Sequence, residues 1–275
     1  MTMHRDDVQI THPKLHEIPV LEQLWIDVFA DPPELIEAFF DAFPPQLHGW
    51  VLRRGDDILS SAYLLHGNLF LSEKEMQASA YVYAVATPSQ HRGKGYAGAL
   101  MRFFTELADR RSLLLYTRPA SPDLFQWYAQ VMQTRPSIGM ESRVFAIRPI
   151  PEKFEPRRLT PSEYGQHRER LLTGRPHIAL SDTFLKLQEQ FLEGDGAGFY
   201  AAGTSCCACE KHGSELVIKE LLAAETESES VIQAMLQHLS AETAVVPSPS
   251  DTAQPNVAFR SDAVPASTSW GLLLD

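Results

Sequence analysis

A basic, glycine-rich turn contains the residues of this sequence that could do chemistry most directly. Arg92, Gly93, Lys94 and Gly95 stand between an apolar run and a helical pattern. The first N–H groups of a helix have no acceptor within the helix, and together with the helix dipole they favour an anion. Glycine lets the backbone approach a phosphate closely, and the two basic side chains add positive charge. The basic turn (residues 92–95) therefore predicts a pyrophosphate site at the start of a helix.

The residues that follow the basic turn are mostly small. Tyr96, Ala97, Gly98 and Ala99 form the expected first helical turn, and their size leaves room for a bulky ligand. The stretch lacks the Gly-Lys-[Ser/Thr] of a Walker loop, and it is not a dinucleotide fingerprint. The sequence therefore predicts a pyrophosphate site of a different kind.

The elements on either side must position the basic turn. Residues 80–86 are apolar on both faces, which predicts a central strand. Residues 95–109 predict an amphipathic helix, and its apolar stripe comprises Tyr96, Leu100, Phe103, Phe104 and Leu107. Residues 50–53 and 58–66 predict a hairpin around Gly55. The other elements expected before residue 150 are two short helices within 20–43, a strand at 113–116, a helix at 124–132 and a final strand at 143–147.

The string from Arg92 to Ala97 resembles the cofactor motif of the GNAT acyl-CoA N-acyltransferase superfamily, [Q/R]-x-x-G-x-[G/A]. A second register that begins at Gln90 also fits. We prefer the first, because it places Ala97 in the opening helical turn and lets Leu100 begin the buried stripe. The order of elements in residues 1–150 also matches the family. The resemblance implies an α/β (α+β) fold with a mixed, splayed central sheet flanked by helices.

The resemblance also implies a cofactor and its binding residues. It implies acetyl-CoA as the co-substrate and no metal. The residues implied to hold the pyrophosphate are Arg92, Gly93, Lys94, Gly95, Tyr96, Ala97 and Gly98. The resemblance implies the pantetheine arm along the preceding strand at about Tyr83 to Thr87, with Val85, Ala86 and Thr87 as the binding residues. One amide there, centred on Val85, would polarise the thioester carbonyl in the manner of an oxyanion hole.

A tyrosine is the catalytic residue that the resemblance implies. The stretch S-P-D-L-F-Q-W-Y-A maps the general acid of the family onto Tyr128, whose phenol could protonate a leaving thiolate. The alternative is that Tyr128 is a core aromatic beside Phe125 and Trp127. The stretch also departs from the family, because Ser121 and Pro122 stand where many relatives have asparagine.

The attacking amine must be neutral, so a base or a water chain must accept its proton. Glu73, Glu75, His66 and Asp31 are candidate bases, and spacing distinguishes none of them. Each has another explanation as a surface or capping residue. Asp31 in particular is expected to be the N-cap of the second helix within 20–43.

A second domain is expected after a proline-rich linker at Pro149, Pro151 and Pro156. We predict a GNAT N-acetyltransferase domain at 1–150 and a smaller, degenerate GNAT-like domain at 151–275. The acidic A-A-E-T-E-S-E-S after Leu222 replaces the basic turn, so the second domain is expected to bind no CoA. Its expected elements are helices at 162–172, 182–191 and 228–239, strands at 198–203, 205–210, 215–222, 243–246 and 270–274, and a loop at 246–255.

Two features within the second domain have more than one interpretation. The stretch G-R-P-H-I-A-L-S-D could line a substrate cleft, or it could lead into a helix capped by Ser181 or Asp182. Cys206, Cys207 and Cys209 are too crowded for a disulfide framework. We interpret them as small thiols of a strand in a reducing compartment, with a zinc site together with His212 as the alternative.

Composition limits the classes of partner. The 275 residues are 44% hydrophobic and 21% charged, with a formal net charge of −11. Such an acidic chain is not expected to bind nucleic acid, and no apolar run approaches the roughly 20 residues of a membrane helix. We therefore expect a cytoplasmic protein with no membrane partner.

The sequence thus predicts an acetyl-CoA-dependent N-acetyltransferase that acts on a primary amine of a small molecule or a peptide. The alternative is a non-catalytic acyl-CoA-binding or sensor protein, which the absence of a distinguished base leaves open.

Overall fold

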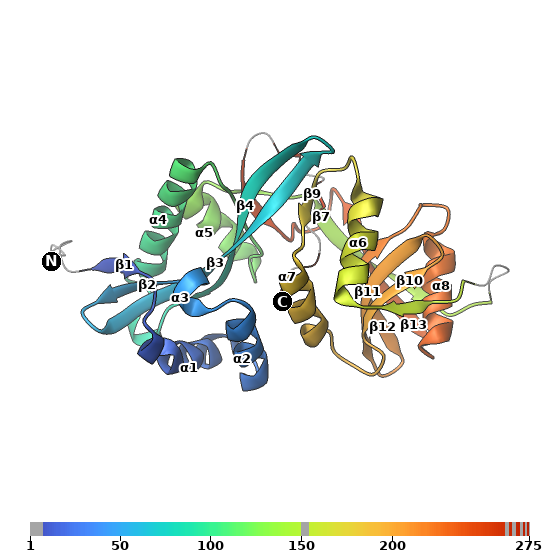
Figure 1. Ribbon diagram of the computed structural model, residues 1–275, viewed down its shortest axis with the longest axis horizontal. Coiled ribbons are helices and arrows are strands. Elements are labelled where there is room, and N and C mark those ends of the chain that lie inside the picture. The colour runs from blue at the N-terminus through green and yellow to red at the C-terminus, as the bar shows by residue number, and fades with distance from the viewer. Residues whose placement is uncertain are drawn as a thin grey trace. The chain divides into compact units, whose positions relative to one another are not determined.

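The computed structural model describes residues 8–149 and 154–261 together with 264, 265, 268, 269, 272 and 274 (Figure 1). The chain forms two compact units. The first comprises Met1–Asn68, Gln77–Pro136 and Val257–Ala263, and the second comprises Leu69–Met76, Ser137–Asn256 and Val264–Asp275.

The first unit is a sheet with helices on both faces. Its helices are α1 (Ile18–Phe29), α2 (Pro33–Ala42), α3 (Pro45–His48), α4 (Tyr96–Arg111) and α5 (Pro122–Met132). Its strands are β1 (Gln9–Thr11), β2 (Gly49–Arg54), β3 (Asp57–Ser72), β4 (Glu75–Ala86), β5 (Leu114–Thr117), β6 (Arg135–Pro136) and β14 (Ala258–Arg260). They lie in the order β1-β2-β3-β4-β5-β14-β6. The 3-10 helices Leu15–Glu17 and Ser89–His91 complete this unit.

Successive side chains of β3 and β4 point to opposite faces of the sheet, so their contacts show which helices cover each face. Ala62 and Val82 pack in one core cluster with Phe104 of α4 and Met132 of α5. On the opposite face lies an aromatic cluster from α1, α2 and the two strands, comprising Trp25, Phe39, Phe40, Tyr63 and Tyr83. In Figure 1, α4 and α5 accordingly lie on one side of the strands, and α1 and α2 on the other.

The predicted strand, turn and helix around residues 92–95 are confirmed, with small shifts of their ends. The structure corrects the expected role of Asp31, because α2 has Pro32 as its N-cap residue and begins at Pro33. The Asp31 carboxylate instead accepts a hydrogen bond of 2.7 Å from the Trp25 indole. Asp31 lies one residue before the N-cap position, so it does not cap the helix. Its carboxylate instead accepts the hydrogen bond of the buried Trp25 indole N–H.

The second unit is a smaller sheet with three helices among its described residues. The helices are α6 (Pro161–Leu172), α7 (Asp182–Phe191) and α8 (Ser228–His238). The strands are β7 (Gly139–Ala146), β8 (Arg157–Leu159), β9 (His177–Ala179), β10 (Gly198–Ala202), β11 (Ser205–His212), β12 (Glu215–Leu222) and β13 (Thr243–Ser250). Six of them lie in the order β7-β13-β12-β11-β10-β8, and β9 pairs with β3.

The two sheets have the same internal order. In the first, the chain runs through β1, β2, β3 and β4 to the parallel neighbour β5, and in the second through β8, β10, β11 and β12 to the parallel neighbour β13. A helix follows the fourth strand in both cases. This repeat agrees with the predicted duplication of one fold.

The last strand of the first sheet was assigned wrongly from the sequence. The strand expected at 143–147 to close the first domain is β7, which pairs with β13 of the second sheet. The first sheet is continued instead by β14, which pairs with β5. The reason is that strand pairing joins residues far apart in the sequence, which local patterns do not encode: β7 pairs with β13 over eight residues, and β14 pairs with β5 over three. The division into domains at 1–150 and 151–275 stays a prediction.

Three features of the second unit bear on the expectations from the sequence: the length of β13, the cap of α7 and the cysteines of β11. The expected loop at 246–255 is in part strand, because β13 continues to Ser250 through Pro247 and Pro249. The ladder between β13 and β12 ends at Val245, before both prolines. The two prolines, which have no N–H group, therefore remove no hydrogen bond between β13 and β12. Ser181 caps α7 as one interpretation predicted, accepting from the Phe184 amide at 3.1 Å. The three cysteines are free and buried on β11, as the preferred interpretation expected.

Two expectations concern residues that are largely not described. The linker around residues 149–156 includes 150–153, and the strand expected at 270–274 includes 270, 271 and 273, all of which lie outside the described residues. Within the described ranges, no helix is long and apolar enough to cross a bilayer. In the same ranges, no group of three or more His, Cys, Asp and Glu side chains could hold a metal ion.

Candidate functional site

The ladder between β4 and β5 ends halfway along β4. The parallel pairs are Ser79 with Leu114, Ala80 with Leu115 and Tyr81 with Tyr116. From Val82 onward β4 continues to Ala86 without β5 as its ladder partner. The two strands therefore separate where the resemblance implies a splayed sheet.

A backbone irregularity marks the separated part of β4. Ala84 has a φ of +47°, a left-handed conformation that is strained for a residue with a side chain. Such residues interrupt a strand and redirect its amides and side chains, and they are frequent at functional sites. Val82 is buried, whereas Tyr83, Ala84 and Val85 are half-buried. The backbone that the sequence assigned to a thioester carbonyl is thus distorted and accessible.

The two glycines of the basic turn both have left-handed backbones. Gly93 has a φ of +73° and Gly95 one of +81°, and Gly95 is the N-cap residue of α4. A Cβ built on either residue would have no atom within 4 Å. The glycines are therefore required by backbone conformation, and the space beside them is open. The first amides of α4, at Tyr96, Ala97 and Gly98, have no acceptor within the helix.

The basic side chains brace the turn. Arg92 Nε donates to the Thr87 carbonyl at 3.1 Å, and Lys94 Nζ donates to the Gln90 carbonyl at 2.7 Å. Both residues are exposed, and among the described residues neither forms an ion pair with a carboxylate. Their positive charge is therefore not neutralised locally, which favours an anion at the amides of α4.

Ser60, which no motif of the sequence distinguishes, is a buried residue of β3 that fixes the end of β4. Its hydroxyl donates to the Ala86 carbonyl at 2.9 Å and lies 3.0 Å from Thr87 Oγ1. The signal available in the sequence was a pair of serines, Ser60 and Ser61, inside an otherwise apolar strand. Ala86 and Thr87 are consequently held in a defined position at the entrance to the basic turn.

Two of the predicted cofactor residues also have structural roles. The Tyr96 side chain packs with Leu52 and Leu59 and lies 3.4 Å from Arg54, so Tyr96 can offer a ligand its backbone. Gly98 is buried, and a Cβ there would lie 3.6 Å from Val131 of α5. A small residue at this position allows α4 and α5 to pack closely.

Tyr128 of α5 is buried in the same core cluster that Val85 of β4 contacts. Burial raises the pKa of Tyr128 to about 12, and a hydrogen bond with the Thr117 side chain partly opposes that rise. The phenol is therefore protonated at neutral pH, as a general acid must be. The helix that carries it begins after Ser121 with Pro122 at its first position, so the departure from the family pattern does not prevent the helix.

The candidate bases differ in their distance from the separated part of β4. Glu75 is the first residue of β4. At about 3.3 Å per residue, the ten steps to Val85 span roughly 33 Å. Glu73 precedes Glu75 in the adjoining turn. His66 is exposed on β3. Asp31 is bonded to Trp25, whose ring lies 5.7 Å from that of Tyr83 on β4.

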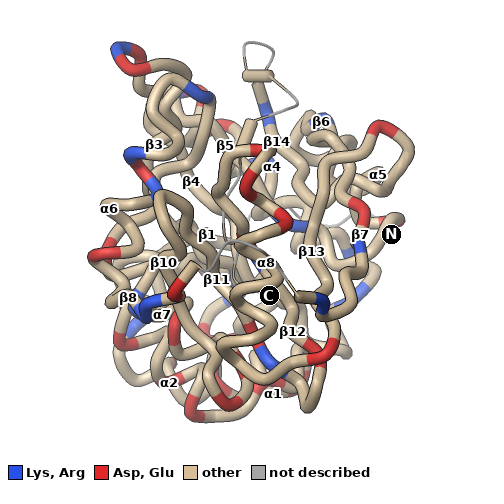
Figure 2. Tube along the Cα trace, turned by 90° about the vertical axis from the view of Figure 1, so that its right-hand side faces the viewer, with Lys and Arg blue, Asp and Glu red and all other residues tan. Residues whose placement is uncertain are grey.

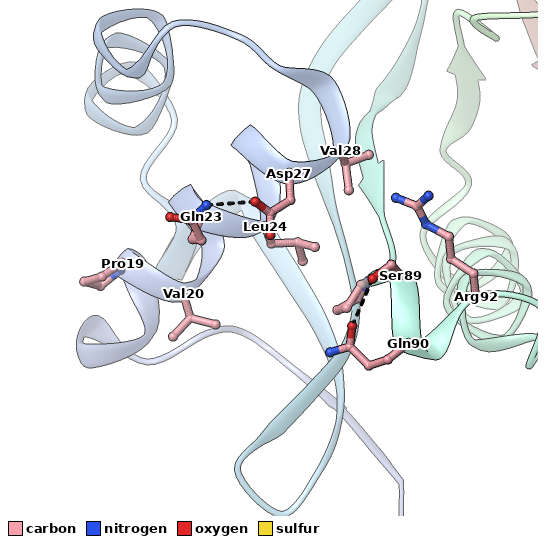
Figure 3. Close-up of a pocket in the computed structure, with 10 residues that line it drawn as sticks. Pro19, Val20, Gln23, Leu24, Asp27, Val28, Ser89, Gln90 and Arg92 are labelled. Carbon is pink, nitrogen blue, oxygen red and sulfur yellow. Dashed lines mark hydrogen bonds between the residues drawn. The ribbon is translucent and has the colours of Figure 1, made fainter.

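A groove next to the basic turn was not foreseen from the sequence. It has a volume of about 650 Å³ and runs between α1 and the residues that follow β4 (Figure 3). The residues that line it are Pro19, Val20, Gln23, Leu24, Asp27, Val28, Pro88, Ser89, Gln90 and Arg92. Its walls come from segments about 60 residues apart, so no local pattern could reveal it.

Residues 9–128 match the family model of the acetyltransferase (GNAT) domain. This stretch contains β4, the basic turn and α4, and it ends at Tyr128. No curated protein matches the sequence.

Solved structures with a similar fold share little sequence with this chain. A GCN5-related N-acetyltransferase from Kribbella flavida is 13% identical, with a TM-score of 0.71, over 94% of this chain and 72% of that one. Eis1 from Mycobacterium abscessus is 14% identical, with a TM-score of 0.65, over 92% and 73%. A tandem GNAT protein from the clavulanic acid biosynthesis pathway is 10% identical, with a TM-score of 0.52, over 92% and 97%.

At such identities these similarities establish the fold alone, and they extend over both units of the chain. The family model adds the sequence evidence for the part that contains the basic turn. Residues 9–128 therefore form a GNAT acetyltransferase domain, and the similarity of fold to solved GNAT proteins extends over the rest of the described chain.

Proposed function

We propose that this protein is an acetyl-CoA-dependent N-acetyltransferase that transfers the acetyl group directly to a primary amine. One observation carries the proposal. The part of β4 that has separated from β5 and bends at Ala84 leads into a turn with two left-handed glycines at the N-terminus of α4. An extended ligand with an anionic middle and a carbonyl at one end fits such an arrangement.

The residues of the basic turn fit the pyrophosphate of acetyl-CoA. Gly93 and Gly95 leave open space on the side where a Cβ would project. Arg92 and Lys94 contribute charge that no carboxylate of the described chain neutralises. The amides of Tyr96, Ala97 and Gly98 would donate to the phosphate oxygens.

Acetyl-CoA, when bound, supplies an acetyl group that is activated as a thioester. Val85, Ala86 and Thr87 would bind the pantetheine arm through their backbone groups, and the Val85 N–H can donate to a carbonyl oxygen that gains negative charge. Tyr128 holds its proton at neutral pH and would donate it to the leaving sulfur. We assign the base to Asp31, because Trp25 links its carboxylate to Tyr83 of β4.

A cationic amine is the acceptor class that the charges of the first unit favour. Between Lys14 and Arg53 the sequence has seven carboxylates and no lysine or arginine. Glu17 is buried against Arg53, and the other six are exposed or half-buried on or next to α1 and α2, whose acidic positions are red in Figure 2. An acidic surface of this kind raises the local concentration of cations.

The cysteines and the net charge support a compartment and a class of acceptor. The three free, buried cysteines of β11 support a reducing compartment, and we propose the cytoplasm. The net charge of −11 supports a small molecule or a peptide as the acceptor and disfavours nucleic acid.

The first test is calorimetric titration with acetyl-CoA of the parent and of Gly95→Glu. We expect binding by the parent and none by the variant, because a carboxylate would stand where the pyrophosphate binds. The matched control is Gly213→Glu, since Gly213 has a φ of +62° and equally open space but lies between β11 and β12. Unchanged affinity in Gly95→Glu would contradict the assigned site.

The second test is a panel of primary amines with acetyl-CoA, read out as released thiol. Cationic amines should be acetylated in preference to neutral ones of similar size, and the preference should weaken as salt is added. Acetyl-CoA binding without transfer to any amine would favour the alternative, a non-catalytic acyl-CoA-binding protein.

A further inference from the structure

Ser60 joins the end of β4 to the middle of the first sheet. It is fully buried on β3, where its register partner on β2 is Leu52. β4 lies on the other side of β3, and the Ser60 hydroxyl donates to the Ala86 carbonyl at 2.9 Å. Ala86 is the last residue of β4 and ends its separated part. This end of β4, which has lost β5 as a partner, is therefore held by a side chain of β3.

The same hydroxyl fixes the direction of a second hydrogen bond. Ser60 Oγ and Thr87 Oγ1 are 3.0 Å apart, and a serine hydroxyl has one hydrogen. Because this hydrogen is given to the Ala86 carbonyl, Thr87 is the donor in the bond with Ser60. Towards any further group the Thr87 hydroxyl oxygen can then only accept a hydrogen bond. Thr87 is half-buried, so it retains access to a ligand.

Thr87 is also constrained at its backbone. It precedes Pro88, and a residue before proline is restricted to an extended conformation. Its carbonyl accepts the bond of 3.1 Å from Arg92 Nε, so Thr87 is joined to the basic turn. This one residue thus connects three parts of the candidate site, which are β3 through Ser60, the separated part of β4, and Arg92.

We propose that Ser60 is a positioning residue for acetyl-CoA, which holds Thr87 so that its hydroxyl oxygen accepts a hydrogen bond from an amide N–H of the pantetheine arm. The inference rests on the proposed function, which places that arm along Val85, Ala86 and Thr87. The amide groups of the arm lie between the thioester and the pyrophosphate, and Thr87 lies between Val85 and Arg92, the residues proposed for those two groups. Without Ser60, the Thr87 hydroxyl could turn and present its hydrogen to the amide N–H.

Calorimetric titration with acetyl-CoA compares the parent with Ser60→Ala, which removes the hydroxyl. We expect the Kd to rise about five- to tenfold, the usual effect of losing one hydrogen bond. The matched control is Ser61→Ala, because Ser61 is the next residue of β3, is 4% exposed and points to the opposite face of the sheet. A Kd of Ser60→Ala within twofold of that of the control would overturn the proposal.

Kinetics with a saturating amine separate positioning from general damage to the fold. In Ser60→Ala the KM for acetyl-CoA should rise by the same factor as the Kd, and kcat should stay within twofold of the parent. A loss confined to kcat, or a thermal destabilisation with an unchanged KM, would show that Ser60 serves packing alone and would overturn the proposal.

A double-mutant cycle tests whether Ser60 acts through Thr87. Thr87→Val keeps the shape and removes the hydroxyl, so it should also raise the Kd about five- to tenfold, whereas Thr87→Ser should bind within about twofold of the parent. In the Thr87→Val background, Ser60→Ala should raise the Kd by a further factor below about two. An equal rise with and without the Thr87 hydroxyl would overturn the proposal.

A spectroscopic measurement on the ligand-free protein keeps the test independent of activity. In protein labelled with ¹³C at the threonine methyl groups, the signal that Thr87→Ser removes identifies Thr87. Ser60→Ala should shift that signal, whereas Ser61→Ala should not. A parent that binds no acetyl-CoA would contradict the proposed function and this inference with it. Binding by the parent together with an unshifted signal in Ser60→Ala would overturn the role of Ser60 alone.

Discussion

Glu220 and Arg168 form a buried ion pair in the second unit, with 3.0 Å between Glu220 Oε2 and Arg168 Nε. Tyr164 donates a hydrogen bond of 2.5 Å to the same carboxylate. Glu220 lies on β12 beyond Val217, where the ladder with β13 has ended. This position on β12 corresponds to the separated part of β4 in the first sheet, and its carboxylate is bonded to two side chains of α6.

The ion pair bears on the predicted lack of CoA binding by the second unit. Residues 223–227, between β12 and α8, are A-A-E-T-E, and Glu227 is the N-cap residue of α8. A carboxylate at the start of this helix repels an anion, where Gly95 and Lys94 favour one at the start of α4. Both observations support the prediction.

The Glu220–Arg168 pair should contribute strongly to stability. Glu220→Ala would leave the fully buried Arg168 guanidinium with only the more exposed Glu169 carboxylate at 3.3 Å, and losing one partner of a buried pair typically costs about 3–5 kcal/mol. Chemical denaturation measures the change, with Arg143→Ala as the control, since the Arg143–Glu141 pair is exposed and contributes little. A loss no larger than that of the control would show that the pair is solvated in solution.

Tyr128→Phe should reduce kcat by about 10²-fold and leave acetyl-CoA affinity unchanged, because the phenol acts in the chemical step. Burial places the pKa of Tyr128 at about 12, so the phenol stays protonated as pH rises from 7 to 10. Ionisation of Tyr128 should therefore cause no fall in the kcat of the parent between pH 7 and pH 10. The pH profiles of the parent and of Tyr128→Phe should have the same shape over this interval. A loss below twofold would indicate that Tyr128 serves packing alone.

β14 should be required by the first unit although it comes from the far end of the chain. Phe259 is fully buried, Arg135 lies over its ring at 4.9 Å, and Arg260 pairs with Asp109 at 2.6 Å. Phe259→Ala should cost about 3–5 kcal/mol and weaken acetyl-CoA binding, because β14 supports β5. Val144→Ala, at an exposed position of β7, is the control. Parent-like stability of Phe259→Ala would argue against β14 in the first sheet.

A second buried pair predicts a pH dependence of stability. Both guanidinium Nη atoms of Arg53 lie 2.6 Å from the carboxylate oxygens of Glu17. This bidentate bond is the main cause that lowers the pKa of Glu17. The stabilisation is therefore complete above the pKa of an unfolded glutamate, about 4.3, and is lost as pH falls through the lower folded pKa.

Glu17→Gln should accordingly be less stable than the parent at pH 7, by about 3 kcal/mol. The difference should shrink as pH falls below about 4, because the parent then loses the same charge. Denaturation curves at a series of pH values measure it, with the exposed Glu37→Gln as the control. A difference that stays constant down to pH 2 would contradict the assignment.

Local patterns were sufficient to predict most helices and strands and the position of the basic turn. The apolar run of β4 and the stripe of α4 are properties of contiguous residues, so periodicity identifies both. The left-handed glycines of the basic turn are likewise local, because glycine adopts positive φ without steric cost. The residues assigned to the pyrophosphate could be named for this reason from the sequence.

The tertiary structure decided which strands pair and which side chains meet. The places of β7 and β14 are set by their pairing with β13 and β5, which lie about 100 or more residues away in the sequence. The bond from Thr117 to Val82, and that from Ser60 to the end of β4, join residues whose spacing has no period. Local sequence therefore determined the elements and the conformation of the basic turn, whereas long-range pairing determined how the separated strand is held, since hydrogen bonds between distant residues form only once the chain has folded.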